Sequence, residues 1–132
     1  MIKFVKNKER YFQLNTDIES ITIGVTGREI NSTDYSGPGR DVRLSDKNLL
    51  SSVTGLSPQN IVMLEQVHGD EILVVDSFPQ CNLPAYGEAD GLITEMTQIA
   101  LVIRTADCVP VFIYDAEKKC LEPYIPDGKV QC

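Results

Sequence analysis

The longest uninterrupted aliphatic run of the chain reads Ile99-Ala100-Leu101-Val102-Ile103. It is far too short to cross a bilayer, which takes about 20 apolar residues in a helix. Apolar side chains at consecutive positions, several of them β-branched, favour instead a strand that is buried on both faces of a sheet. Polar residues follow at once in Arg104-Thr105-Ala106-Asp107-Cys108, and we therefore expect the strand to end near Arg104.

Other segments of the chain are also enriched in β-branched and aliphatic residues, and together they predict a sheet as the largest element of the fold. A charged turn is expected at Asp115–Lys119, and Pro110 must lie at a strand start or on a sheet edge because it cannot donate to a ladder. One helix is expected from near Asp46, capped by Ser45 and ended by Gly55. The sequence thus predicts an α+β domain with a central mixed sheet flanked by helices. The other predicted strands are Ile21–Thr26, Ile61–Leu64, Ile72–Val75, Leu92–Thr94 and Val109–Tyr114.

Size and charge limit the classes of function. The 132 residues suit one domain, 1–132. A net charge of −7 and a pI near 4.6 argue against general nucleic-acid binding, which needs clustered Lys and Arg. The amino terminus has no signal-peptide pattern and no run is long enough to span a membrane, so we expect a cytoplasmic protein. The four cysteines, Cys81, Cys108, Cys120 and Cys132, are then expected to be reduced thiols.

His68 and Cys108 are the candidate residues for chemistry. His68 is the only histidine, and each of the two residues follows a predicted strand, where functional groups tend to lie. Neutral imidazole and thiolate are the donors that zinc and copper prefer, and together they also form a base and nucleophile pair. Asp107 is a candidate for orienting a ligand or substrate, with a turn residue as the alternative. On pattern alone, a buried inert cysteine and a hydrogen-bonded structural histidine remain open.

Three blocks of the sequence resemble the laccase-domain family, also described as multicopper polyphenol oxidoreductase, purine nucleoside phosphorylase-like or peptidoglycan-editing-factor-like. The blocks occur in the family's order and approximate spacing, and three in order are specific. The resemblance is strongest from Gln66 to Tyr114. The blocks are Gln66-Val67-His68-Gly69, Ala89-Asp90-Gly91-Leu92-Ile93-Thr94 and Arg104-Thr105-Ala106-Asp107-Cys108-Val109-Pro110-Val111.

The resemblance implies a mixed-sheet α/β fold and a zinc or copper site formed by one histidine, one cysteine and a second histidine. His68 and Cys108 match the first two ligands. The second histidine belongs to a His-Ala-Gly-Trp-Arg-Gly segment, which this chain lacks, since it has one histidine and no tryptophan. Residues 121–132 are a divergent tail, and the chain corresponds to the first half of a family domain. We therefore expect an incomplete fold and an incomplete metal site.

The implied reaction is phosphorolysis of a purine nucleoside, with adenosine deamination also attributed to the family. Arginine would hold the phosphate through its planar fork, and Arg28 and Arg104 are the candidates, although ion pairing at the surface is the common alternative. Arg28 falls where the family has an arginine after its first strand. Asn48 falls near a family asparagine and is the third candidate for substrate binding.

Three hypotheses follow. The first is a purine nucleoside phosphorylase-type enzyme whose missing ligand is supplied by Asp107, Cys120 or a residue of the tail 121–132. The second is a truncated, non-catalytic relative that binds a ligand or partner, with a homo-oligomer covering its sheet edge. The third is a metal-free hydrolase in which Cys108 is the nucleophile and His68 the base, and copper-dependent polyphenol oxidation is a further alternative.

Overall fold

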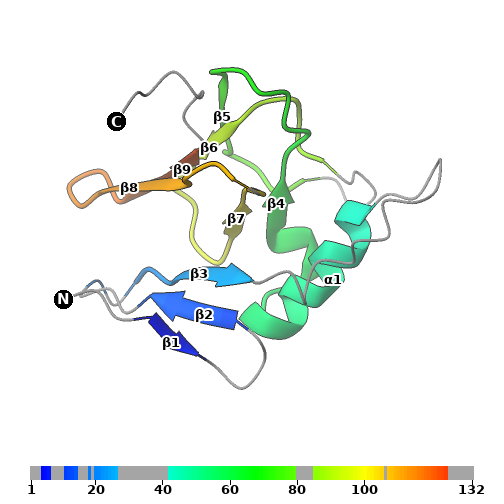
Figure 1. Ribbon diagram of the computed structural model, residues 1–132. Coiled ribbons are helices and arrows are strands. Elements are labelled where there is room, and N and C mark those ends of the chain that lie inside the picture. The colour runs from blue at the N-terminus through cyan, green and yellow to red at the C-terminus, as the bar shows by residue number, and fades with distance from the viewer. Residues whose placement is uncertain are drawn as a thin grey trace. The chain divides into compact units, whose positions relative to one another are not determined.

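The structure is a computed structural model that describes residues 4–6, 11–14, 18, 20–26, 42–79, 85–105 and 107–124. The chain forms two compact units, Met1–Gly55 and Leu56–Cys132, and each is described by itself. The elements of both units are labelled in Figure 1. No helix in the described ranges is both long and apolar enough to cross a membrane.

The first unit contains an antiparallel sheet and the helix. Strands β1 (Phe4–Lys6), β2 (Tyr11–Leu14) and β3 (Ile23–Thr26) pair in the order β1-β2-β3. Strand β3 confirms the carboxyl-terminal part of the strand predicted at Ile21–Thr26. Strands β1 and β2 were not predicted from the sequence.

Helix α1 spans Val42–Thr54, so the prediction that it begins near Asp46 was wrong. Ser45 lies within the first turn of the helix and is not the residue before it. Val42, Arg43 and Leu44 are ordinary helix-compatible residues, and a serine is tolerated in a first turn, so a cap residue alone did not locate the start. The predicted end is confirmed: Gly55 has a φ of +74°, which favours glycine, and its N–H donates to the Ser51 carbonyl over 2.9 Å.

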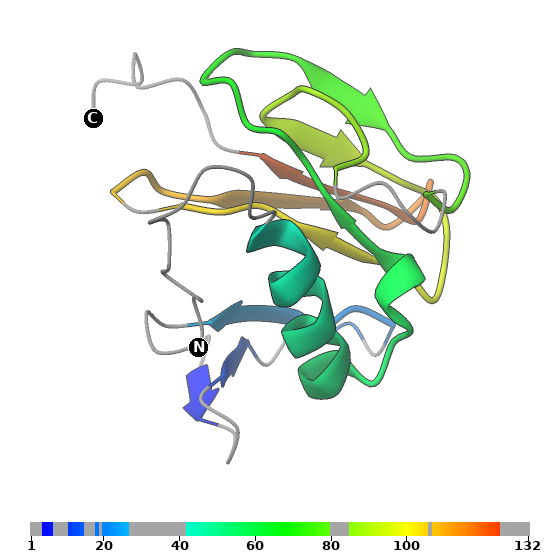
Figure 2. The same cartoon turned by 90° about the vertical axis from the view of Figure 1, so that its right-hand side faces the viewer.

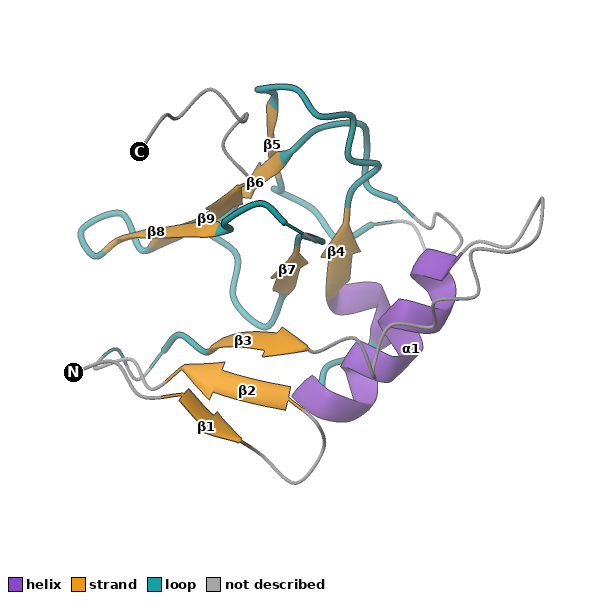
Figure 3. Cartoon of the chain, in the orientation of Figure 1, coloured by secondary structure: helices purple, strands orange, loops and turns teal. Residues whose placement is uncertain are grey.

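The second unit is built from two sheets that confirm the mixed α+β class. Strand β4 and strand β7 form a parallel pair, and the short helix η1 precedes β4. The larger sheet has the order β5-β6-β9-β8, with β5 parallel to β6 and the other neighbours antiparallel. Figure 2 shows this sheet after a quarter turn about the vertical axis, and Figure 3 colours strands and loops differently. The elements are η1 (Pro58–Asn60), β4 (Ile61–Met63), β5 (Ile72–Val74), β6 (Gly91–Ile93), β7 (Ala100–Val102), β8 (Val111–Asp115) and β9 (Cys120–Tyr124).

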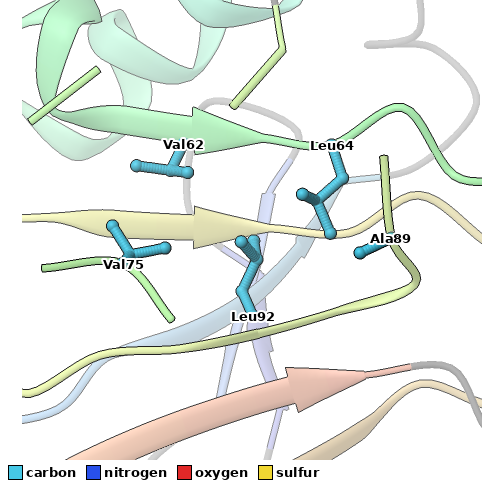
Figure 4. Close-up of a cluster of buried hydrophobic side chains, with 5 residues drawn as sticks. All are labelled: Val62, Leu64, Val75, Ala89 and Leu92. Carbon is cyan, nitrogen blue, oxygen red and sulfur yellow. The ribbon is translucent and has the colours of Figure 1, made fainter. Parts of the chain in front are cut away.

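The core of the second unit consists of aliphatic side chains from both of its sheets. Val62 and Leu64 come from β4 and the residue after it, whereas Leu92 comes from β6. Figure 4 shows these side chains gathered with those of Val75 and Ala89. All five are at most 1% exposed, so they remove nearly all of their apolar surface from water. This core anchors the strand ends from which the candidate site residues emerge.

The prediction that the aliphatic strands are buried on both faces holds for β4, holds only in part for β7, whose three residues are half-buried, and is wrong for β5. Ile61, Val62 and Met63 are all buried. In β5, by contrast, Val74 is 65% exposed and Ile72 is 40% exposed. Only Leu73, between them, packs against the core. Strand β5 pairs in parallel with β6, but one face of β5 is exposed to solvent. Alternate side chains of β5 therefore point away from the core.

The predicted charged turn is confirmed as the connection between β8 and β9. Asp115 Oδ1 accepts hydrogen bonds from the backbone N–H groups of Glu117 (2.9 Å) and Lys118 (3.0 Å). These bonds, that of Lys118 above all, together with the Lys118 ammonium, lower the pKa of Asp115, while partial burial opposes them. The carboxylate therefore supports the turn in its ionised form.

This turn predicts a pH dependence of stability. The folded pKa of Asp115 lies below the unfolded value of about 3.9, so its stabilising contribution is present above that value and is lost as the pH falls through the folded pKa. Melting temperatures of the wild type and Asp115→Asn, measured between pH 6 and pH 2, should differ at pH 6 and converge once the pH falls below the folded pKa. A difference that stays constant over this range would contradict the assignment.

Candidate functional site

The segments that carry His68 and Cys108 leave the same edge of the β4·β7 pair. The two strands are parallel, and their last paired residues are Met63 and Val102. Parallel strands end at the same edge of a sheet, so the chain after β4 and the chain after β7 begin side by side. Figure 3 shows both as loops. Residues about 40 positions apart in the sequence are thereby brought into one region.

Gln66 connects these two loops through its side-chain amide. Its Nε2 donates to the Arg104 carbonyl over 2.8 Å, and its Oε1 accepts from the Arg104 N–H over 2.7 Å. The side chain thus satisfies both backbone groups of Arg104, as a neighbouring strand would do. It extends the pairing beyond the last ladder residues and fixes the spacing between the two loops.

Gln66→Ala is expected to lower the free energy of unfolding by about 1–3 kcal/mol, since two part-buried hydrogen bonds are lost. The imidazole NMR signals of His68, the only histidine, should shift as the loops separate. The matched control is Asn60→Ala, because Asn60 Nδ2 donates to the Gln98 carbonyl (2.9 Å) at the opposite end of the same strand pair. If Asn60→Ala shifts the His68 signals as much as Gln66→Ala, Gln66 has no specific role at the site.

His68 adopts a left-handed backbone conformation, with a φ of +60°. For a residue with a Cβ atom this conformation costs about 1–2 kcal/mol, and such residues concentrate at functional sites. The side chain of His68 is exposed. The surrounding structure must therefore hold the backbone in place while leaving the imidazole accessible.

Asp90, the residue before β6, supplies this support. Its carboxylate accepts three backbone hydrogen bonds: Oδ2 from Gly69 (2.7 Å) and Val67 (3.3 Å), and Oδ1 from His68 (3.1 Å). Asp90 is only 4% exposed. A buried carboxylate needs such partners, and successive N–H groups around a left-handed residue form a concave anion-binding site. Asp90 belongs to the block Ala89–Thr94, and its side chain thus contacts the block Gln66–Gly69.

Cys108 presents an exposed thiol on the other loop. The Thr105 hydroxyl donates a hydrogen bond to the Cys108 carbonyl and closes the turn between these residues. Asp107 is also exposed. Its predicted role in orienting a ligand remains a prediction.

The donor types at this edge fit zinc or copper, but the described donors are too few. Imidazole and thiolate suit either ion. A catalytic zinc site normally has three protein ligands, whereas the described residues contain no group of three or more His, Cys, Asp or Glu that could hold a metal ion. Cys120 and Asp107, named above as substitutes, do not complete such a group.

The predicted substrate-binding residues are distributed over both units. Arg104 is half-buried beside Gln66, on the Cys108 side of the site. Asn48 is exposed on α1 in the first unit, Met1–Gly55. Arg28 lies outside the described residues. The roles of all three in substrate binding remain predictions.

Two residues of the site were not singled out from the sequence, Gln66 and Asp90. Both lie within the quoted blocks, and this was the one signal available. An Asp before a Gly is typical of a turn, and a Gln beside a strand end has no distinctive pattern. Their importance depends on partners more than 20 positions away in the chain, Asp90 with His68 and Gln66 with Arg104.

An open hollow of about 450 Å³ lies elsewhere in the second unit. It is formed by β5, β6, β8 and β9 near the charged turn. Cys120, named above as a substitute ligand, lines it, but His68, Cys108, Asp107 and Arg104 do not, so the hollow is separate from the site. Its lining consists of Val74, Ile93, Thr94, Glu95, Ile113, Asp115, Lys118 and Cys120.

Comparison with known proteins decides the family. Residues 26–122 match the sequence pattern of the family described as multi-copper polyphenol oxidoreductase laccase. The chain belongs to this family. The match covers all three blocks and both loops of the site, and it confirms the resemblance on which the sequence analysis relied.

Sequence relatives of this laccase-family chain include proteins named purine nucleoside phosphorylase. The protein of Corynebacterium glutamicum is 34% identical over 87 residues, covering 66% of this chain and 35% of its own length. That of Mycobacterium bovis is 36% identical over 86 residues, covering 65% and 33%. The chain therefore spans about a third of the length of these curated relatives.

Solved structures confirm the laccase-domain fold. The crystal structure of YlmD from Geobacillus stearothermophilus matches with a TM-score of 0.75 and 21% identity, over 92% of this chain and 51% of that protein. The hypothetical protein YfiH from Bacillus licheniformis matches with a TM-score of 0.61 and 17% identity, over 94% and 48%. The laccase-family chain thus covers about half the length of each of these two proteins.

Proposed function

We propose that this chain carries part of a purine nucleoside phosphorylase-type site, in which His68 and Cys108 act as metal ligands and Arg104 binds phosphate. The observation that supports this most is the double hydrogen bond from Gln66 to the Arg104 backbone, which holds the His68 and Cys108 loops next to each other. The names of the relatives from Corynebacterium glutamicum and Mycobacterium bovis support the substrate class.

The proposed reaction exchanges the purine for phosphate at the ribose. A phosphate oxygen forms a bond to C1′, the bond from C1′ to the purine nitrogen breaks, and the leaving base takes up a proton. A guanidinium such as that of Arg104 binds two phosphate oxygens at once and neutralises charge as the phosphate approaches. This local cation is needed because the chain as a whole carries a net charge of −7.

The test combines metal analysis with an activity assay. The purified chain is equilibrated with Zn²⁺ or Cu²⁺, unbound ion is removed, and the ratio of metal to protein is measured. Inosine is then supplied with and without phosphate, and hypoxanthine is followed. Adenosine in a parallel assay reports deamination as inosine. We expect one metal ion per chain, held by His68 and Cys108 together with a donor outside the described residues, and hypoxanthine release that requires phosphate.

A second candidate function is ligand binding without turnover. The small number of metal donors favours this function. His68 and Cys108 are two donors, and the described residues contain no group of three ligands. Metal binding without hypoxanthine or inosine formation would support it and would overturn the enzymatic proposal. Absence of both metal binding and phosphate-dependent turnover would overturn the metal site as well.

A further inference from the structure

We propose that Asp90 is a positioning residue for His68: its buried carboxylate holds the 67–69 backbone in the conformation that presents the imidazole to the site. This inference rests on the proposed function of His68 and adds a residue that acts on it from another strand. Asp90 acts through the backbone of His68 and does not itself need to reach substrate or metal.

The geometry of the three hydrogen bonds carries the argument. The N–H groups of Val67, His68 and Gly69 all point to one carboxylate, at 3.3, 3.1 and 2.7 Å. A left-handed residue within such a segment turns successive N–H groups toward one side, where they can bind a single anion. The φ of +60° at His68 is therefore what forms the concave site, and the Asp90 carboxylate is what fills it.

The carboxylate is in turn anchored to the core. The N–H of Asp90 donates to the Glu71 carbonyl over 3.1 Å, and the N–H of Ala89 donates to the Glu65 carbonyl over 3.1 Å. Ala89 and Leu92, on either side of Asp90 in the sequence, are fully buried. The position of His68 is thus set by the core of the second unit, although its own side chain is exposed.

A change of the His68 backbone would redirect its side chain. If the 67–69 segment relaxed to a negative φ at His68, the Cα–Cβ bond would point in a different direction, and the imidazole would move relative to the Cys108 loop. Gln66 would not prevent this change, because its side-chain amide binds the backbone of Arg104 and not that of residues 67–69. Gln66 therefore sets the spacing of the loops, and Asp90 sets the direction of His68.

The decisive variant is Asp90→Asn, which keeps the size of the side chain. One of its two oxygens becomes an NH₂ group, so at least one of the three backbone N–H groups faces a donor. The matched control is Asp115→Asn, since Asp115 also accepts backbone N–H bonds, from Glu117 and Lys118, in the turn between β8 and β9. Both variants remove one carboxylate from the same unit.

The first measurement needs neither metal nor activity. In metal-free protein, we expect Asp90→Asn to shift the imidazole NMR signals of His68 and to speed amide exchange at His68 and Gly69 by at least tenfold. Asp115→Asn should leave both unchanged. The second measurement is Zn²⁺ affinity, determined by competition with a chromophoric chelator, which we expect to fall about 10–100-fold in Asp90→Asn and less than twofold in the control.

The outcomes separate this inference from the proposed function. Unchanged His68 signals and unchanged amide exchange in Asp90→Asn would overturn the positioning role, whether or not the wild type binds metal. If these signals change while the wild type binds no metal and has no turnover, the positioning role stands and the proposed function fails. Should Asp90→Asn not fold, amide exchange in the wild type decides, since His68 and Gly69 amides that exchange as fast as free backbone would also overturn the role.

Discussion

Cys108→Ala should lower both Zn²⁺ affinity and kcat/KM for inosine phosphorolysis by at least about a hundredfold, because the thiolate is one of the two donors proposed among the described residues and alanine cannot replace it. A single imidazole, that of His68, would remain. Affinity is measured by competition with a chelator, and activity by hypoxanthine release. His68→Ala should have an effect of similar size for the same reason.

The chain provides its own control for this experiment. Cys120 is also a free cysteine, but it lies in β9 and is half-buried. Cys120→Ala should therefore change Zn²⁺ affinity and turnover less than about twofold. Equal losses in the two variants would indicate a general effect of thiol removal and would remove Cys108 from the site.

The metal-free hydrolase hypothesis also predicts a loss of activity in Cys108→Ala, so alkylation must separate the two. A thiolate bound to metal is shielded from alkylating reagents, whereas a free nucleophile paired with a base is not. Iodoacetamide labelling of Cys108, followed by peptide mass analysis, should become slower when Zn²⁺ is added. Labelling that is fast and independent of Zn²⁺ would favour the hydrolase.

The strands that the sequence predicted well are those with a dense aliphatic pattern. Ile61–Leu64 and Ile72–Val75 each contain a strand one residue shorter, because β-branched and aliphatic residues at consecutive positions are characteristic of β-strands, whether buried as in β4 or partly exposed as in β5. The run Ile99–Arg104 contains β7 as a shorter strand, Ala100–Val102. The ends differ because pairing partners, rather than propensity, decide where a ladder stops.

Strand β9 was missed because it lacks this pattern. The segment 121–132 was interpreted as a divergent tail, yet Cys120–Tyr124 lies between β6 and β8 in the sheet. Pro123 argues against a central strand, since it has no N–H to donate. The structure accommodates Pro123 because β9 and β6 do not pair at this position. Their pairing consists of Gly91↔Tyr124 and the bridge Thr94↔Leu121.

At the candidate site, too, the sequence predicted what depends on single residues and missed what depends on partners far away in the chain. His68 and Cys108 could be named from the sequence because their donor chemistry is a property of the residues themselves. The hydrogen bonds that place them could not, because Gln66 and Arg104 are 38 positions apart and Asp90 is 22 positions from His68. Such contacts follow from the register of strand pairing, which a single sequence does not specify.

Leu92→Ala should lower the free energy of unfolding of the second unit by about 3 kcal/mol, the cost of a cavity in a close-packed core. Leu92 is fully buried and belongs to the cluster with Val62, Leu64, Val75 and Ala89. For a unit of this size the loss corresponds to a fall in melting temperature of more than about 10 °C. Urea denaturation and thermal melting measure both quantities.

The control for Leu92 is Val74→Ala on the neighbouring strand. Leu92 is paired with Leu73, whereas Val74 is paired with Ile93, one position further along the same ladder. Successive side chains alternate between the faces of a sheet, so these two pairs lie on opposite faces. Val74→Ala, at a position 65% exposed, should cost less than about 0.5 kcal/mol. If it costs as much as Leu92→Ala, the buried and solvated faces of this sheet are assigned wrongly. Asp90, two residues before Leu92, would then lose the buried environment that its role requires.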